Sequence, residues 1–287
     1  MKRLIFILPL YFLFLVLPIY SQNNNQIIKF DFKWDDKGNL TIFAENNDCC
    51  PYHLMFHLPS PQGLNPVGGD RTEKVIERGR TEIMSLRRTQ NYNVNPGRYS
   101  YTFYPGNPRL KPNLDYQYSL PIAKGDSLDV QPVQSPRYTQ KFILKNVNDT
   151  IYASRAGIMC DYLSRKTETL TIYHKDGTMA DYQPGRKFNE ILVMPGNRVK
   201  VGQPIATVVP YQREVMFSVY FLEKDKLKEK MNPHSGLVPL FQTIDGNNLK
   251  LDFHKCYVAE MNIDMETQDM SKKEREKYIK NLTKNKK

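Results

Sequence analysis

Residues 193–206 read VMPGNRVKVGQPIA, a pattern typical of short β-strands joined by tight turns. Gly196 and Gly202 flank a central Val-Lys pair, and glycine adopts the positive φ of such turns at little steric cost. We therefore expect strands on both sides, at residues 190–193 and 204–209. No long helical period appears before residue 223, so this part of the chain is predicted to be β-sheet.

The surrounding residues, 116–222, extend the same pattern. Asp176-Gly177 is a hairpin signal that joins predicted strands around Ile172 and Met179. Glycine and proline turns separate most of the other segments that we expect to be strands. These segments are residues 141–144, 151–153, 157–160, 169–174, 179–182 and 215–222. Residues 116–222 are thus predicted to form one β domain.

An earlier group of strands is predicted within residues 22–115. Residues 27–34 alternate in part between apolar and polar, a turn cluster follows at residues 35–39, and the return strand covers residues 40–44. Further predicted strands are residues 52–58, 82–86 and 99–104. Short strands at this spacing favour a small Ig-like β-sandwich, which a linker at residues 109–115 follows. The fold class expected for the whole chain is therefore mostly β.

The C-terminal part differs from both predicted β domains. Residues 223–270 form an extension, with a charged segment of helical composition at residues 224–230. A further strand pair is expected at residues 237–243 and 249–253. Residues 271–287 are predicted to be a short basic helical tail.

The tail opens with a capping box, in which Ser271 is the N-cap and Glu274 completes the motif. Its apolar face contains only Tyr278, Ile279 and Leu282. Because short isolated helices are marginal in water, this helix is expected to need a partner for full stability.

The first 21 residues have the layout of a secretory signal peptide. Lys2 and Arg3 precede an almost wholly apolar run at residues 4–20, and Ser21 then precedes a polar segment. We expect cleavage near Ser21 and export to the periplasm or the periplasmic face of the cell envelope. The alternative is an uncleaved membrane anchor, because the run is about long enough to span a bilayer. No later segment is long and apolar enough to do so.

The chain is basic, with a formal net charge of +11, and removing Lys2 and Arg3 leaves +9. Residues 272–287 hold eight Lys or Arg and two Glu, so +6 of that charge lies in the tail. Such a tail suits anionic lipid or anionic cell wall, whereas export argues against nucleic acid as a partner. The simpler interpretation is a solvated helix.

Four cysteines are candidates for disulfide bonds: Cys49, Cys50, Cys160 and Cys256. An even number in an exported chain suggests one or two bridges. Adjacent Cys49 and Cys50 are poorly placed to bond each other, and the spacing does not decide which cysteines pair. The paired C-x-x-C clusters of a structural zinc site are absent from the sequence.

Four segments between residues 149 and 219 resemble, in the same order, the motifs of lysostaphin/LytM-type metallopeptidases. They are DTIYASRAGIM at 149–159, LTIYHKDGT at 170–178, the segment at 193–206, and MFSV at 216–219. This resemblance implies the duplicated hybrid motif β fold of that family for residues 116–222. More weakly, residues 43–52 resemble the sandwich that precedes such domains in exported proteins of Bacteroidetes-type bacteria.

The resemblance also implies that the zinc ligands have been lost. Active members of the family hold zinc with His, Asp and His, but residues 135–142 contain neither His nor Asp. The family's Y-x-H-L histidine is missing near Tyr182 and Gln183, and its H-x-H pair falls on Glu214 and Met216. Methionine is a poor ligand for divalent zinc. His174 occupies a hairpin position where the family also has a histidine, and a structural role is expected for it.

We therefore predict a pseudoenzyme without catalytic residues, metal or other cofactor. It is expected to bind or regulate cell-wall enzymes, or to scaffold an envelope complex, with envelope proteins or peptidoglycan as partners. The residues expected to line the vestigial groove are Tyr182, Gln183, Glu214, Met216 and His174.

Two alternatives remain open from the sequence. One is an active zinc endopeptidase that cleaves peptidoglycan cross-links with ligands drawn from elsewhere. It would need His or Asp ligands from other parts of the chain, such as His53, His57, His234 or Asp252. The other is a structural subunit of an envelope assembly that makes its contacts through the sandwich and the basic tail. The sequence contains no G-x-S-x-G nucleophile elbow and no phosphate-binding glycine loop.

Overall fold

The computed structural model describes residues 27–90, 93–133, 138–145, 149–160, 168–229 and 232–285. Strands dominate these residues and the helices are short, which confirms the mostly-β prediction. The predicted signal peptide, residues 1–21, lies outside the described residues. Within them, no helix is both long and apolar enough to cross a membrane.

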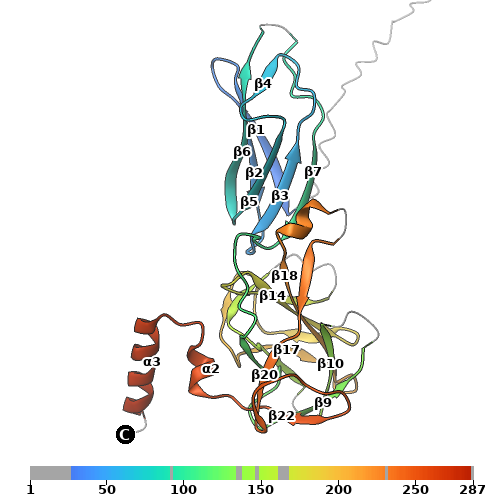
Figure 1. Ribbon diagram of the computed structural model, residues 1–287, viewed down its shortest axis with the longest axis vertical. Helices are drawn as coiled ribbons and strands as arrows, with labels where there is room; N and C mark the ends of the chain where they lie inside the picture. Colours follow the sequence, from blue (N-terminus) through green and yellow to red (C-terminus); the bar gives the residue numbers. More distant parts are fainter. Residues whose placement is uncertain are drawn as a thin grey trace, which may run out of the picture.

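Seven strands between residues 28 and 105 form two sheets that pack on a common core (Figure 1). One sheet has the order β1-β2-β6-β4 and the other has the order β5-β3-β7. The strands are β1 (Ile28–Trp34), β2 (Leu40–Asn46), β3 (Tyr52–His57), β4 (Leu64–Pro66), β5 (Arg71–Ile76), β6 (Gly79–Arg88) and β7 (Ser100–Pro105). Leu40, Ile42 and Ala44 are at most 1% exposed, because a strand turns alternate side chains toward one face.

A nine-stranded sheet dominates the second half of the chain. Its order is β16-β12-β13-β14-β18-β10-β9-β22, and β19 pairs with β18 beside this row. The strands are β9 (Ser127–Gln131), β10 (Thr139–Leu144), β12 (Gly157–Met159), β13 (Leu170–Tyr173), β14 (Thr178–Pro184), β16 (Arg198–Val199), β18 (Glu214–Leu222), β19 (His234–Leu237) and β22 (Cys256–Val258). Val215, Phe217 and Val219 are fully buried on the inner face, where they pack in a second core.

Two smaller sheets complete this second core. One has the order β11-β17-β15 and the other the order β21-β20-β8. Their strands are β8 (Gln117–Ser119), β11 (Thr150–Tyr152), β15 (Phe188–Ile191), β17 (Pro204–Val208), β20 (Leu240–Thr243) and β21 (Gly246–Leu249). Gly196 and Gly202 have φ values of +86° and +70°, as expected for their tight turns.

The predicted strand at residues 237–243 is wrong in one respect, because two strands occupy this segment. β19 ends at Leu237 and pairs with β18, whereas β20 begins at Leu240 and pairs with β8 and β21. Pro239 lies between them and lacks the N–H that a continuous strand would need. The predicted partner at 249–253 is also shifted, since β21 ends at Leu249.

The two cores meet through a small apolar cluster made of Cys50, Cys160, Tyr173, Met179 and Tyr220. Cys50 follows β2, and the other four residues lie on or beside the outer face of the nine-stranded sheet. A disulfide bond joins Cys50 to Cys160 across this junction. The sandwich therefore covers one end of the outer face of the large sheet.

Three short helices lie in the last quarter of the chain. They are a 3-10 helix, η1 (Asp225–Lys228), and two α-helices, α2 (Ile263–Thr267) and α3 (Lys272–Asn285). The predicted capping box is confirmed: Ser271 N donates to Glu274 Oε2 at 2.8 Å, and Glu274 N donates to Ser271 Oγ at 3.4 Å. Helix α3 projects to one side of the sheets (Figure 1).

Candidate functional site

Glu214 and Met216 project from the outer face of the nine-stranded sheet. Their neighbours on β18, Val215 and Phe217, are fully buried on the opposite face. Gln183 on β14 lies directly across from Met216, and Lys141 on β10 lies across from it on the other side. Directly opposed residues share a face, so Gln183, Met216 and Lys141 form one row across three strands.

Glu214 is held by an ion pair within this outer face. Its carboxylate lies 2.8 Å from Lys141 Nζ, and both side chains are about one-third exposed. A pair with this much solvent contact contributes at most about 1 kcal/mol to stability. The effect of this ion pair is local. The Lys141 ammonium, which belongs to the row of Gln183, Met216 and Lys141, engages the Glu214 carboxylate.

The next row toward the sandwich is polar. Asp181 on β14 and Thr139 on β10 both lie across from Ser218 on β18, and the two hydroxyls are 2.8 Å apart. Asp181 Oδ1 accepts hydrogen bonds from Thr171 Oγ1 at 2.6 Å and from Tyr220 at 3.2 Å. Burial raises the pKa of Asp181 to about 6. No sequence motif pointed to this carboxyl, and only the strand register places it here.

Tyr182 does not line this face, in contrast to the prediction. It alternates with Asp181 and Gln183 along β14 and is therefore turned into the core, where its ring centroid lies 5.1 Å from that of Phe217. Its hydroxyl accepts a hydrogen bond from Ser154 N at 2.7 Å. These contacts support a structural role for Tyr182 in packing the core.

His174 is also remote from the row of Gln183 and Met216. It is fully buried beyond the end of β13, and its Nδ1 lies 2.8 Å from the carbonyl oxygen of Ala156. Burial, together with the positive charge of Arg155, lowers the pKa of His174 to about 3, so the ring is neutral. The five predicted groove residues thus separate into an outward group (Gln183, Glu214 and Met216) and two buried residues.

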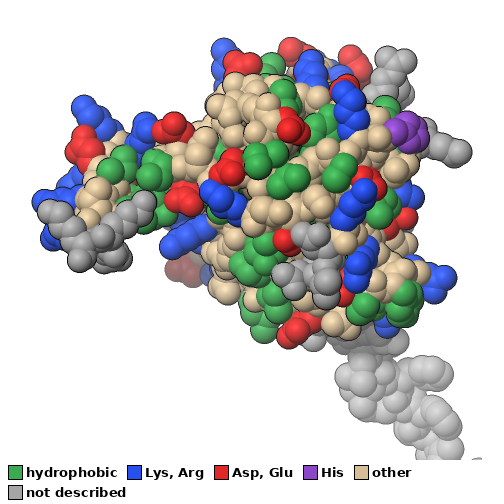
Figure 2. All heavy atoms as spheres, turned by 90° about the horizontal axis from the view of Figure 1, so that it is seen from below, with side chains coloured by type: hydrophobic (Ala, Val, Ile, Leu, Met, Phe, Trp, Pro, Cys, Tyr) green, Lys and Arg blue, Asp and Glu red, His purple; other side chains and the backbone are tan. Residues whose placement is uncertain are grey.

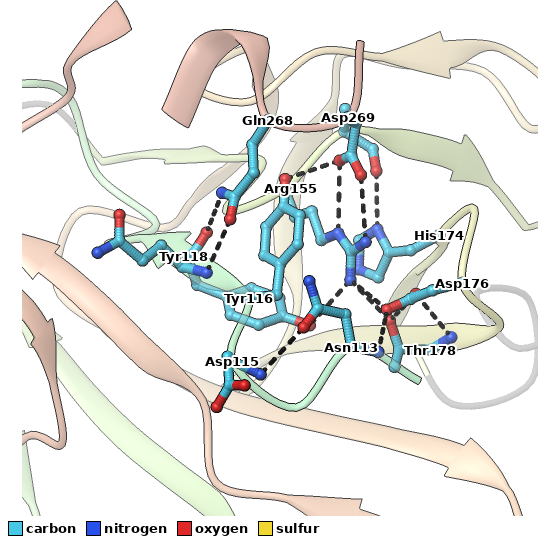
Figure 3. Close-up of polar contacts among 12 residues, drawn as sticks. Asn113, Asp115, Tyr116, Tyr118, Arg155, His174, Asp176, Thr178, Gln268 and Asp269 are labelled. Atoms are coloured by element: carbon cyan, nitrogen blue, oxygen red, sulfur yellow. Dashed lines mark hydrogen bonds and ion pairs between the residues drawn. The ribbon is translucent and has the colours of Figure 1, made fainter. Parts of the chain in front are cut away.

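Arg155 forms a buried polar network that the sequence did not reveal (Figure 3). The side chain is 2% exposed and makes ion pairs with Asp176 at 3.0 Å and Asp269 at 3.2 Å. Its guanidinium carbon lies 3.4 Å from the centre of the Tyr116 ring, and the Tyr116 hydroxyl donates to Asp269 Oδ2 at 2.7 Å. Asp269 lies one residue beyond Gln268, the C-cap of α2, so this network attaches the C-terminal segment to the β domain.

A cleft of about 690 Å³ lies beside this network, between the sheet edge and the C-terminal helices. Lys175, Arg198 and Lys200 line it from the sheet side, and Glu266, Glu274 and Tyr278 line it from the helical side. Charges of both signs also gather on the projecting helix at the left of Figure 2. The pKa of Glu274 is lowered mainly by its hydrogen bonds to Ser271 and, to a smaller extent, by the positive charges of Lys175 and Arg198. The two walls therefore complement each other in charge.

The residues at the expected zinc positions do not fit a zinc site. Glu214 is paired with Lys141, and Met216 presents only a thioether. Across the described ranges, no group of three or more His, Cys, Asp or Glu side chains could hold a metal ion. Residues 135–137 of the segment that replaces the first ligands lie outside these ranges.

The four residues of the alternative ligand set lie apart and have other contacts. His53 lies 3.8 Å from Glu73, and His57 lies 3.1 Å from Asp70, both within the sandwich. His234 Nε2 lies 2.9 Å from the carbonyl oxygen of Pro105, and Asp252 pairs with Lys255 at 2.6 Å. Nothing in these contacts directs the four side chains toward Met216.

Of the four cysteines, the structure joins Cys50 and Cys160, whose Cα atoms are 5.7 Å apart. Cys49 is half-buried, and its Sγ lies close to Gly196. Cys256 is exposed on β22. The disulfide therefore links the two cores, which the cysteine spacing alone did not indicate.

No model of a known protein family matches the chain, and no curated protein matches it. Among solved structures, Helicobacter pylori Csd3 in a hexagonal crystal is similar with a TM-score of 0.29 and 11% identity, over 74% of this chain and 70% of that chain. The same protein in an orthorhombic crystal gives a TM-score of 0.28 and 10% identity, over 91% and 76%. We draw no functional conclusion from similarity at this level.

Proposed function

We propose that this chain is a non-catalytic, peptidase-like protein of the cell envelope that binds an extended peptide without cutting it. The observation that carries this proposal is which residues occupy the two positions where the resembled peptidases have their H-x-H pair, and what those residues contact. Glu214 is engaged by Lys141, and Met216 lies between Gln183 and Lys141. A cation and a thioether at this point favour contact with a ligand over coordination of zinc.

The outer face of the sheet has the chemistry of a peptide-binding surface. Its two rows supply an exposed amide at Gln183, an ammonium at Lys141 and hydroxyls at Thr139 and Ser218. Met216 adds a flexible apolar contact between these polar groups. Donors, acceptors and an apolar side chain at strand spacing suit an extended peptide, which presents backbone groups and alternating side chains.

The envelope assignment rests on the predicted signal peptide and on the resemblance of the motifs to cell-wall peptidases. The ligand class proposed is the peptide part of peptidoglycan or an extended segment of a cell-wall enzyme. The basic tail and the sandwich would then be additional contact surfaces for the assembly.

Zinc content provides the first test. Residues 22–287 would be incubated with zinc, desalted and analysed for bound metal. We expect no stoichiometric zinc and no submicromolar affinity in calorimetry. Stoichiometric zinc, together with chelator-sensitive release of muropeptides from peptidoglycan, would favour the alternative of an active endopeptidase.

Binding provides the second test, by co-sedimentation with purified peptidoglycan sacculi. Met216→Glu places a charge in the centre of the outer face and is expected to lower the bound fraction severalfold. Met194→Glu is the matched control, because Met194 is 72% exposed between β15 and β16 and belongs to neither row. Equal binding by the two variants would remove the outer face from the proposal.

A further inference from the structure

The sandwich is open along one side. β1 and β7 are the end strands of their sheets, and both lie on this side, where Phe30 of β1 and Tyr101 of β7 have ring centroids 4.7 Å apart. Among the described residues, β7 pairs only with β3, and β1 pairs only with β2. Figure 1 shows β7 along one margin of the sandwich. At its last residue the outer edge of β7 is engaged, because the carbonyl oxygen of Pro105 lies 2.9 Å from His234 Nε2. As far as the described chain is concerned, the edge is available for pairing from Ser100 to Phe103.

The backbone of this edge presents unpaired polar groups. Gly106 N donates to the carbonyl oxygen of Pro51, which fixes the phase of the antiparallel ladder between β3 and β7. In such a ladder, alternate residues direct both N–H and C=O to the same neighbour. Tyr101 and Phe103 consequently point these groups away from β3, toward the open edge.

Core-facing aromatic side chains are left exposed at the same place. Tyr101 and Phe103 lie across from Phe56 and Leu54, which are 2% and 0% exposed. Tyr101, in contrast, is 40% exposed, and neighbouring Tyr99 is 41% exposed. The aromatic seam consists of Phe30, Phe32, Tyr99, Tyr101 and Phe103. An additional strand at this edge would cover these rings, which otherwise keep apolar area in water.

Comparison with an immunoglobulin sandwich shows which strand position no described strand fills. The sheet β1-β2-β6-β4 corresponds to strands A-B-E-D of an immunoglobulin sandwich, and β3 and β7 take the places of C and F. In that fold, strand G pairs with the outer edge of F, and no described strand occupies this position. β7 also reads SYTFYP, without the charged residues that usually protect an edge strand from pairing.

We propose that an extended segment of a partner protein, with apolar side chains at alternate positions, pairs with β7 as the missing strand and covers the aromatic seam. The row of backbone donors and acceptors selects an extended peptide rather than a glycan or lipid. The seam selects apolar side chains at every second position, because only these face the core. Because His234 engages the outward carbonyl of Pro105, the new strand pairs along residues 100–103, a length of about 13 Å.

The test uses the full mature chain and a phage-displayed library of random dodecapeptides. We expect enrichment of sequences that alternate apolar and polar residues. Tyr101→Pro removes one outward N–H and one aromatic ring but no hydrogen bond to β3. The affinity for a selected peptide, measured by fluorescence anisotropy, should therefore fall about tenfold or more. Tyr101→Phe should retain the affinity. Trp34→Ser, which removes a 47% exposed aromatic at the end of β1, is the control and should also retain it.

Amide hydrogen exchange gives a second measurement that does not depend on the folding of Tyr101→Pro. Bound peptide should slow exchange at Tyr101 and Phe103, because their N–H groups become part of a new ladder. The proposal is overturned if no alternating sequence is enriched, if Tyr101→Pro binds as tightly as Tyr101→Phe, or if these amides stay unprotected. It is also overturned if sedimentation shows that a second copy of this chain fills the edge, as a dimer that Tyr101→Pro abolishes.

Discussion

Arg155 is the buried charge on which the attachment of the C-terminal segment depends. Removing one partner of a buried ion pair leaves the other charge uncompensated. Asp176 and Asp269 keep 14% and 21% of their side chains exposed, so the penalty falls at the low end of the usual range. We expect Arg155→Met to lower the free energy of unfolding by about 3 kcal/mol. Urea denaturation followed by circular dichroism measures this value.

The control for this substitution is Arg213→Met. Arg213 pairs with Asp149 at 2.8 Å, but its side chain is 33% exposed. Its loss should therefore cost about 1 kcal/mol or less. Limited proteolysis adds a local measure, since the segment after Ala259 should become more accessible only in Arg155→Met. Similar costs for the two variants would contradict a special role for Arg155.

Asp181 makes stability depend on pH in the direction opposite to most carboxyl groups. Its pKa in the folded protein is raised by burial from 3.8 to about 6, so the folded state binds this proton more tightly than the unfolded state. The contribution is favourable below about pH 4 and is lost as the pH rises through about 6. This rise in pKa corresponds to a stability difference of about 3 kcal/mol between the two ends of this pH range. Relative to Asp181→Asn, the wild type should therefore lose stability between pH 4 and pH 6 in urea titrations. A constant difference across this interval would be incompatible with a raised pKa.

At the scale of single elements, α3 is the helix whose stability depends most on local interactions. Of its side chains whose burial the structure describes, Tyr278 and Leu282 are half-buried and the others are exposed. Ser271→Ala removes the N-cap and should destabilise the helix by about 1 kcal/mol. Faster amide exchange within residues 272–285 measures this loss, while the melting temperature of the sheets stays unchanged.

Thr283→Ala is the control for the capping box. Thr283 Oγ1 bonds back to Ile279 O and Lys280 O within the helix, and these bonds are not needed to begin it. Alanine is also the better helix former, so this variant should exchange no faster than the wild type. If Ser271→Ala and Thr283→Ala exchange alike, the capping box has no measurable effect.

Local signals were sufficient to predict most strands and the last helix. The turns at Gly177, Gly196 and Gly202 and the capping box at Ser271 depend on residues a few positions apart, and each forms as expected. The strands β4, β5, β8, β9, β16 and β22 were not predicted. Four of them have only two or three residues, too few to show a clear period, but β5 and β9 have six and five. The parallel pairing of β8 with β20 joins residues more than 120 positions apart and has no local signal.

The predicted site was less accurate than the predicted fold, for a reason that β14 illustrates. Met179, Ala180 and Tyr182 are all fully buried, although alternate residues of a strand point to opposite faces. The sandwich covers the outer face near Met179, so both faces are buried at this end and apolar residues do not alternate cleanly. The sequence therefore could not show that Tyr182 points into the core while Gln183 points outward.

At the scale of the whole molecule, two separate cores are held together by a small junction. The sandwich core and the core of the large sheet contain different residues, and the cluster around Cys50 and Cys160 lies between them. His234 adds a polar contact to Pro105, which ends β7. A junction of this size has few apolar side chains to fix the relative position of the two cores. We therefore expect the disulfide bond to contribute most to holding that position.

The disulfide should therefore stabilise the molecule and restrict its shape. Cys50 and Cys160 are 110 residues apart, and a loop of that length gives an entropic stabilisation of about 4 to 5 kcal/mol. We expect the double variant Cys50→Ala, Cys160→Ala to lose a few kcal/mol in urea denaturation and to show a larger radius of gyration in X-ray scattering. Cys256→Ala removes an exposed thiol and is the control, with a change within about 0.5 kcal/mol. If the double variant unfolds at the urea concentration of the control and scatters identically, noncovalent contacts alone hold the two cores in place.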